Sequence, residues 1–293
     1  MMIKNAISRD EVVERISKLH SFPLIITQLL ASMEDPEINL KILVKHIEHD
    51  PLIAARVLSR ANRAGLQSQN TRSVRDIFTA TSLIGTTLVR DMAIIGSIVG
   101  LFEDLVPVGL PVVLMRHSID VGVCSEELAL ATTASASAAL VAGLLHDVGQ
   151  LCLYRKDPGA FRMARDMVHS HHIGIEKAEN EVFGVDHAMI GAWIAESWSL
   201  PTNIVAAIRH HHLPDPALDE PLVPIVHIAE VLTNALDLTS NSQNSVTNVS
   251  SAVCQALGLT WSDDVRPILG RIEARSRHAH LALISQPRKT KSS

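Results

Sequence analysis

The stretch AGLLHDVGQLCL, residues 142–153, is the part of the sequence that decides the fold and points to a site. It places a histidine and an aspartate, His146 and Asp147, side by side within a long apolar run. An imidazole and a carboxylate are costly to bury unless something pairs with them. The pair therefore indicates a metal, a hydrogen-bonded core or water opposite these two side chains.

Apolar residues on both sides of this stretch recur with helical spacing. In residues 39–50 they follow the i, i+3, i+4, i+7 pattern, with Asn39 placed to cap the helix. The next helix is predicted to open with Asp50-Pro51, because aspartate accepts amide hydrogens there and proline suits the first helical position. Further helices are expected near 112–131, 134–154, 158–172, 174–184, 187–198, 202–211, 221–238, 250–258 and 262–283. No strand pattern is found, so periodicity predicts an all-α helical bundle.

The expected organisation has three consecutive parts. Residues 1–106 form an N-terminal helical part, residues 107–240 a second helical subdomain, and residues 241–293 the last helices and a disordered basic tail. VPVGLP, residues 106–111, is the expected seam because it holds two prolines and a glycine.

Composition excludes several classes of protein. The net charge of −5 gives no basic footprint for nucleic acid. No apolar stretch reaches the ~18–20 residues that a membrane span needs. The three isolated cysteines suggest buried reduced thiols, and hence a cytoplasmic protein.

Histidine is unusually frequent, with 15 residues, many of them in the middle of the chain. Imidazole and carboxylate groups lie in several separate predicted helices, and His227 and Glu230 share one helix face. Helical bundles build metal sites from such side chains on facing helices. The candidate ligands are His117, His146, Asp147, His187, His211, His212 and Glu230. Nitrogen-rich ligation favours a divalent transition metal such as iron or manganese, and His146-Asp147 could serve one ion or bridge two.

Taken singly, each candidate also has an ordinary explanation. A lone His117 is more often a core or surface residue, and His187 after Asp186 fits a plain helix start. Histidines at a helix C-terminus, such as His211, suit the helix dipole without a metal. Spacing alone does not show that the segments converge.

The order of these residues resembles the HD phosphohydrolase superfamily: His117, then His146-Asp147, then an acid on a later helix. The later acid is normally aspartate, whereas the matching segment VHIAEVL carries Glu230. The segment DHAMIGAWIAESWSLPTNIVAAIRHHH, residues 186–212, is similar to the HDOD domain, the HD-related output domain of bacterial signalling proteins.

The N-terminal half resembles the same domain in its D-P-x-L-x-x-R-x-L-x-x-A-N pattern. Asp50-Pro51 and Asn62 match this pattern, while Ile53 replaces leucine and Arg63 replaces the usual following serine. The resemblance covers roughly residues 10–240. It implies an all-α fold in which an N-terminal helical subdomain packs on an HD-like one.

Two departures from catalytic relatives bear on function. Gln150 stands where those proteins usually carry lysine after H-D-x-G, and glutamine brings no charge to a phosphate. No G-Y-P follows His211-His212. The resemblance thus implies a signalling module that acts through partners such as a sensor kinase, a receiver or a cyclic di-nucleotide enzyme, with no catalytic residue assigned. A metal-dependent phosphohydrolase acting on nucleotides or cyclic di-nucleotides, and a metal-gated switch, are the alternatives.

Overall fold

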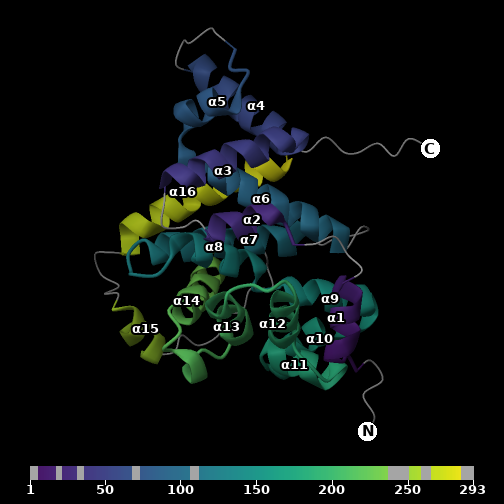
Figure 1. The fold of residues 1–293 in the computed structure, drawn as a ribbon. Helices are drawn as coiled ribbons and strands as arrows, with labels where there is room; N and C mark the ends of the chain where they lie inside the picture. Colours follow the sequence, from purple (N-terminus) through teal and green to yellow (C-terminus); the bar gives the residue numbers. More distant parts are fainter. Residues whose placement is uncertain are drawn as a thin grey trace, which may run out of the picture. The chain divides into compact units, whose positions relative to one another are not determined.

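The computed structural model describes residues 6–17, 22–31, 36–67, 73–105, 112–236, 251–258 and 265–284. Within these ranges all regular secondary structure is helical, which confirms the predicted all-α class. Figure 1 shows the arrangement of the helices. The helices of the first half are α1 (Arg9–Ser17), α2 (Leu24–Ala31), α3 (Pro36–His49), α4 (Pro51–Gln67), α5 (Ile77–Ile84), α6 (Thr86–Leu105) and α7 (Val112–Ala129).

The remaining helices carry most of the candidate ligands or pack beside them. They are α8 (Ala136–Leu145), α9 (Val148–Lys156), α10 (Pro158–His171), α11 (Ile175–Phe183), α12 (His187–Ser197), α13 (Thr202–His210), the 3-10 turn η1 (Asp215–Ala217), α14 (Leu222–Ala235), α15 (Ser251–Leu257) and α16 (Val265–Ile284). The predicted seam at 106–111, the segment 237–250 and the tail after residue 284 lie outside the described residues.

The single helix expected over 134–154 was wrong, because the chain breaks at His146-Asp147 into α8 and α9. Asp147 has φ −98° and ψ 10°, outside helical geometry. Two residues on, the backbone of Gly149 lies so close to α12 that a Cβ atom there would sit 2.0 Å from the His187 carbonyl oxygen. The break therefore turns α9 toward α12 and brings His146-Asp147 to the end of two helices.

Two of the expected helix starts can be compared directly with the structure. Asp50 caps α4 as predicted, because its Oδ1 accepts hydrogen bonds from the amides of Leu52 and Ile53 at 2.9 and 3.0 Å. Asn39, in contrast, does not cap α3, which begins at Pro36. The proline at the first helical position explains the earlier start.

The chain divides into two compact units that are discontinuous in sequence. Unit 1 comprises Met1–Phe22 and Gly100–Glu273, and unit 2 comprises Pro23–Val99 and Ala274–Ser293. Each unit therefore joins two separate stretches of the chain, whereas the sequence predicts three consecutive parts.

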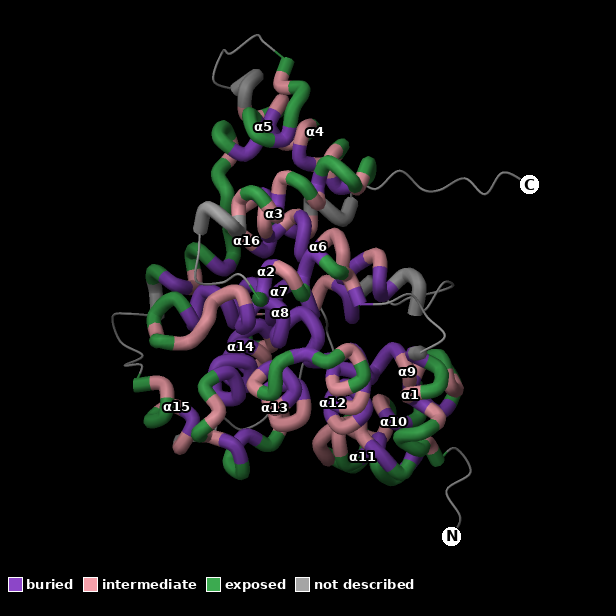
Figure 2. The backbone as a smooth tube through the Cα atoms, viewed as in Figure 1, coloured by how far each residue is buried: buried purple, intermediate pink, exposed green. Residues whose placement is uncertain are grey.

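The core of unit 1 is built on α7, α8 and α14, where buried backbone is concentrated in Figure 2. Helix α8 is alanine-rich, and its residues from Ala138 to Leu145 are all buried. A Cβ atom at Gly143 would lie 2.8 Å from the Gly122 Cα of α7. Small residues thus let α7 and α8 approach closely enough to bring His117 within α7 and His146 at the end of α8 to one site.

Helix α1 belongs to unit 1 through polar contacts as well as its apolar face. The Glu11 carboxylate pairs with Lys156 of α9 at 2.7 Å, and Arg9 pairs with Glu196 of α12 at 2.9 Å. Val12 and Ile16 are buried. The N-terminal helix therefore packs on the helices that follow the break at His146-Asp147.

In unit 2, the motif residue Asn62 has a structural role. Its side-chain amide donates to the Val74 carbonyl at 2.9 Å, and its Oδ1 accepts from the Val74 amide at 2.8 Å. This pair of bonds fixes the segment before α5 against α4. Helices α5 and α6 are split at Gly85.

One helical stretch within the described residues is long and apolar enough to cross a membrane. It is Ala136–Lys156, and 83% of its apolar window is buried inside the protein. Helices α5 and α6 meet the same test only if the two are counted together as one span, although they are bent by 116° at the break between them. The expectation that no stretch is long and apolar enough to cross a membrane is therefore wrong. Ala136–Lys156 is nevertheless mostly buried, as a core helix is.

The cysteines are all free, in line with the expectation of reduced thiols. Cys124 is buried, whereas Cys152 and Cys254 are only half-buried. Burial raises the pKa of Cys152 to about 12, so this thiol is a poor nucleophile at neutral pH.

Candidate metal centre

The seven candidate ligands meet in unit 1, although they lie far apart in sequence. They form two groups in which the possible ligand atoms lie within 4.8 Å of one another. The first group is Asp147, His187, His211 and His212, and the second is His117, His146 and Glu230. These residues come from five places in the fold: the break between α8 and α9, the start of α12, the end of α13, and the middle of α7 and of α14.

Asp147 connects the two groups. Its Oδ1 lies 3.1 Å from His187 Nε2 and 3.8 Å from His211 Nε2. Its Oδ2 lies 3.4 Å from His146 Nε2 and 3.9 Å from His117 Nε2. One carboxylate thus presents one oxygen to each group, which is the arrangement of a bridging ligand.

Glu230 completes the second group. Its Oε2 lies 2.7 Å from His117 Nε2 and 3.2 Å from His146 Nε2. Its Oε1 accepts a hydrogen bond from Asn234 Nδ2, one turn later on α14, at 2.8 Å. The extra methylene relative to aspartate therefore does not keep this carboxylate from the cluster, and Asn234 holds it in place.

Hydrogen bonds at the other ring nitrogen aim the imidazoles inward. His146 Nδ1 donates to the Gly143 carbonyl at 2.7 Å, and His211 Nδ1 donates to the Ile208 carbonyl at 2.8 Å. Both bonds reach back three residues at the end of a helix. In each ring Nε2 is left to face the cluster, which is the orientation that a ligand histidine needs.

The ring nitrogens of the first group lie close to one another, as they would around a cation. His187 Nε2 lies 3.2 Å from His211 Nε2 and 3.0 Å from His212 Nε2. Lone pairs that face each other at such distances repel unless a proton or a cation lies between. His146 Nε2 is likewise buried without a hydrogen-bond partner among the described residues. The donor set of imidazoles and carboxylates suits a divalent transition metal.

Without a metal, protons would occupy part of the cluster. Burial opposes the charge on His146, but Asp147 and Glu230 outweigh it and raise its pKa to about 10. Burial likewise opposes charge on His187, yet Glu179 and Asp147 hold its pKa well above the ordinary value. Burial and the neighbouring His187 lower the pKa of His212 to about 4. The cluster thus combines protonated and neutral rings around anionic carboxylates.

We expect metal binding at pH 7 to release protons. A metal needs deprotonated ligands, and the raised pKa values of His146 and His187 mean that those rings hold protons in the metal-free protein. Affinity should therefore rise with pH, by about tenfold per pH unit for each proton displaced. Calorimetric titration with Mn²⁺ in two buffers of different ionisation enthalpy measures the number of protons. Equal heats in both buffers would contradict the expected protonation.

Glu179 of α11 is a residue that the sequence analysis missed. It is fully buried, and its Oε2 accepts from the His187 amide at 2.8 Å and from His187 Nδ1 at 2.5 Å. It therefore fixes the orientation of His187 and leaves Nε2 for the cluster. A signal was present, because Glu179 lies on the same helix stripe as the buried Ala178 and Val182.

Glu179→Gln should weaken metal affinity by about 10–100-fold without unfolding the protein. The amide keeps the shape of the carboxylate but loses the charge that favours the Nδ1 hydrogen of His187. Glu181→Gln, an exposed neighbour on α11, is the matched control and should leave affinity unchanged. Competition for Mn²⁺ against a chelating dye measures both variants, and equal affinities would rule out an orienting role for Glu179.

Two further residues from the sequence analysis lie near the cluster but outside both ligand groups. His227 Nδ1 donates to the His211 carbonyl at 2.7 Å, so it supports the chain after α13. Gln150 is buried on α9, and its Oε1 has no hydrogen-bond partner among the described residues.

The fold and this cluster define an all-helical protein of the HD-like class, with histidines and acids gathered at helix ends. The chain belongs to the HDOD family, because the HDOD domain model matches residues 19–214. This confirms the resemblance drawn from the motifs.

Solved structures share the fold over nearly the whole chain. An HDOD domain protein of unknown function from Geobacter sulfurreducens has a TM-score of 0.65, with 24% identity over 94% of this chain and 92% of that one. A candidate phosphohydrolase from Shewanella amazonensis SB2B gives 0.62, with 22% identity over 92% and 95%. A candidate signal transduction protein from Marinobacter aquaeolei VT8 gives 0.68, with 22% identity over 96% and 61%.

A sequence relative is an uncharacterized protein from Treponema pallidum (strain Nichols). It is 26% identical over 240 residues, which cover 77% of this chain and 44% of the relative. The chain thus spans less than half the length of this relative.

Proposed function

We propose that the chain is a regulatory HDOD module that holds divalent transition metal in its histidine and carboxylate cluster and acts through protein partners without catalytic turnover. The observation that carries the proposal is the convergence of both ligand groups on Asp147. The glutamine at position 150 separates the chain from the catalytic pattern that the resemblance implies.

His187, His211 and His212 would hold one ion, and His117, His146 and Glu230 a second, with Asp147 shared. Bound there, a transition metal would supply Lewis acidity and lower the pKa of a coordinated water. The side chains of this chain hold and orient the cluster, through Glu179 on His187 and Asn234 on Glu230.

Two features of the cluster favour metal binding without catalytic turnover. The most exposed side chains of the second group, His117 and Glu230, are only 12% and 13% exposed, and that of His146 is wholly buried. A substrate phosphate therefore has little ligand surface to contact. The nearby position 150 offers a neutral amide, which brings no positive charge to a phosphate.

The test pairs metal analysis with an assay for turnover. Wild-type protein purified after growth with iron and manganese should contain metal, and it should hydrolyse bis(p-nitrophenyl) phosphate and cyclic di-nucleotides no faster than Asp147→Asn. Catalytic turnover by the wild type that is lost in the variant would overturn the regulatory proposal. Absence of bound metal in the wild type would overturn the metal-holding part.

The regulatory reading also requires that the metal changes a surface available to partners. We expect bound metal to slow hydrogen exchange at 146–149 and 210–213, the helix ends that carry the ligands. Sensor kinases, receivers and cyclic di-nucleotide enzymes are the partner classes proposed. Unchanged exchange at both helix ends on metal loading would argue against a metal-gated switch.

A metal-dependent phosphohydrolase is the second candidate function. The observation in its favour is that every ligand position of the HD pattern is filled, with Glu230 in contact with His117 and His146. The turnover assay above separates this candidate from the first.

A further inference from the structure

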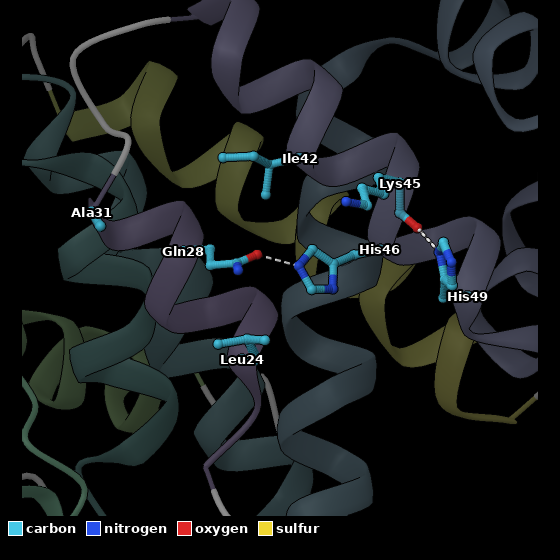
Figure 3. A pocket seen from close by; sticks show the side chains of 7 residues that line it. All are labelled: Leu24, Gln28, Ala31, Ile42, Lys45, His46 and His49. Atoms are coloured by element: carbon cyan, nitrogen blue, oxygen red, sulfur yellow. Dashed lines mark hydrogen bonds between the residues drawn. The ribbon is translucent and has the colours of Figure 1, made fainter.

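A second feature lies in unit 2, on helices that carry none of the residues of the histidine cluster. A pocket enclosing about 580 Å³ lies between α2 and α3 (Figure 3). Pockets of some 300–1,000 Å³ are the usual size for small-molecule sites. The volume is thus sufficient for an organic ligand of moderate size.

One part of the pocket lining is aliphatic. Leu24 and Ala31 come from α2, and Ile42 comes from the facing α3. Leu24 is 61% exposed, so it presents apolar surface at the edge of the pocket. A ligand with an apolar body would cover this surface.

The other part of the lining is basic and comes from α3. Lys45 and His49 are four residues apart, so they lie on one helix face. His49 Nδ1 donates to the Lys45 carbonyl at 2.6 Å, which fixes the ring beside the lysine. Lys45 is exposed, so its ammonium group is accessible to an anion.

His46 and Gln28 close the space between the two helices. His46 Nε2 donates to Gln28 Oε1 across the pocket (Figure 3). Burial lowers the pKa of His46, and the nearby His49 and Lys45 lower it further, which reflects the positive field of the α3 face. In unit 2 as a whole, lysine and arginine outnumber aspartate and glutamate, whereas the reverse holds in unit 1.

We propose that the pocket between α2 and α3 binds an amphiphilic organic anion, with a carboxylate or phosphate on Lys45 and His49 and an aliphatic body against Leu24, Ala31 and Ile42. Carboxylate and phosphate share the charge that Lys45 recognises. The apolar part of the lining is aliphatic, with Leu24, Ala31 and Ile42, which favours an aliphatic body.

The test uses decanoate, decyl phosphate and the neutral decanol, each displacing the anionic dye 1-anilinonaphthalene-8-sulfonate from the full chain. We expect decanoate or decyl phosphate to bind more tightly than decanol. Lys45→Ala with His49→Ala should weaken the binding of the anions on the order of tenfold and leave decanol unchanged, because the double variant removes the exposed ammonium charge of Lys45. The preferred anion identifies the head group.

Two more variants keep the test decisive. Lys177→Ala, an exposed lysine of α11 in unit 1, should leave every affinity unchanged. Leu24→Glu should abolish binding of the anions, because it places a negative charge at the exposed apolar edge. Equal binding of decanol and the two anions, or unchanged binding in the double variant, would overturn the proposal. Circular dichroism spectra that match the wild type show that each variant is folded.

Discussion

Asp147→Asn is expected to remove bound metal from both ligand groups at once. One carboxylate oxygen faces His187 and His211, and the other faces His146 and His117, so this single side chain serves both groups. Asparagine keeps the shape but has one neutral oxygen and an amide that cannot ligate. We expect affinity to fall at least about 100-fold, beyond the loss typical of an outer hydrogen-bond partner. Elemental analysis of purified protein measures the metal per chain.

Comparison variants show whether the effect comes from bridging. His212→Gln removes a half-buried ligand of the first group only, so it should lower the stoichiometry of metal rather than abolish binding. Asp166→Asn, on the exposed face of α10, should bind metal as the wild type does. Removing one member of a buried ion pair can cost about 3–5 kcal/mol, so metal content is compared only in samples with helical circular dichroism spectra. Full metal content in folded Asp147→Asn would exclude a bridging role.

Local periodicity was sufficient to predict most helices, because each buries one apolar stripe. It failed at His146-Asp147, where the apolar pattern runs on without interruption from α8 into α9. The break depends on Gly149 packing against α12, a contact between residues about 40 positions apart that no local pattern contains. The discontinuity of unit 1 was missed for the same reason, because α1 joins this unit through contacts with α9 and α12, which are distant in sequence.

The candidate ligands could be predicted because the order of the motifs identified them. The residue that orients one of them, Glu179, could not be predicted in this way. His117, His146 and Asp147 stand in recognisable spacing, and the resemblance linked them to Glu230. Glu179 belongs to no motif, and only its position on the apolar stripe of α11 distinguishes it from an ordinary surface acid. Its burial follows from the paired amide and ring of His187, which only the folded chain brings to it.

Gly149→Ala is expected to be among the most destabilising single-methyl changes in unit 1. The added Cβ would lie 2.0 Å from the His187 carbonyl oxygen and 2.9 Å from the Gly191 amide nitrogen. Both are backbone atoms of α12, so no side chain can turn aside and the two helices must separate. Overpacking of this kind costs about 3 kcal/mol, which corresponds to a fall in Tm of about 10 °C. Thermal unfolding followed by circular dichroism measures it.

The matched control is Gly270→Ala in α16, where an added Cβ meets nothing within 4 Å. Alanine there should raise stability by about 0.5–1 kcal/mol, because it lowers the entropy of the unfolded chain. The two substitutions add the same atom, so opposite signs isolate the contact between α9 and α12. Because that contact positions His187, Gly149→Ala should also bind Mn²⁺ more weakly at a temperature where it remains folded. A Tm equal to that of the wild type would show that α9 and α12 do not approach as closely as the site requires.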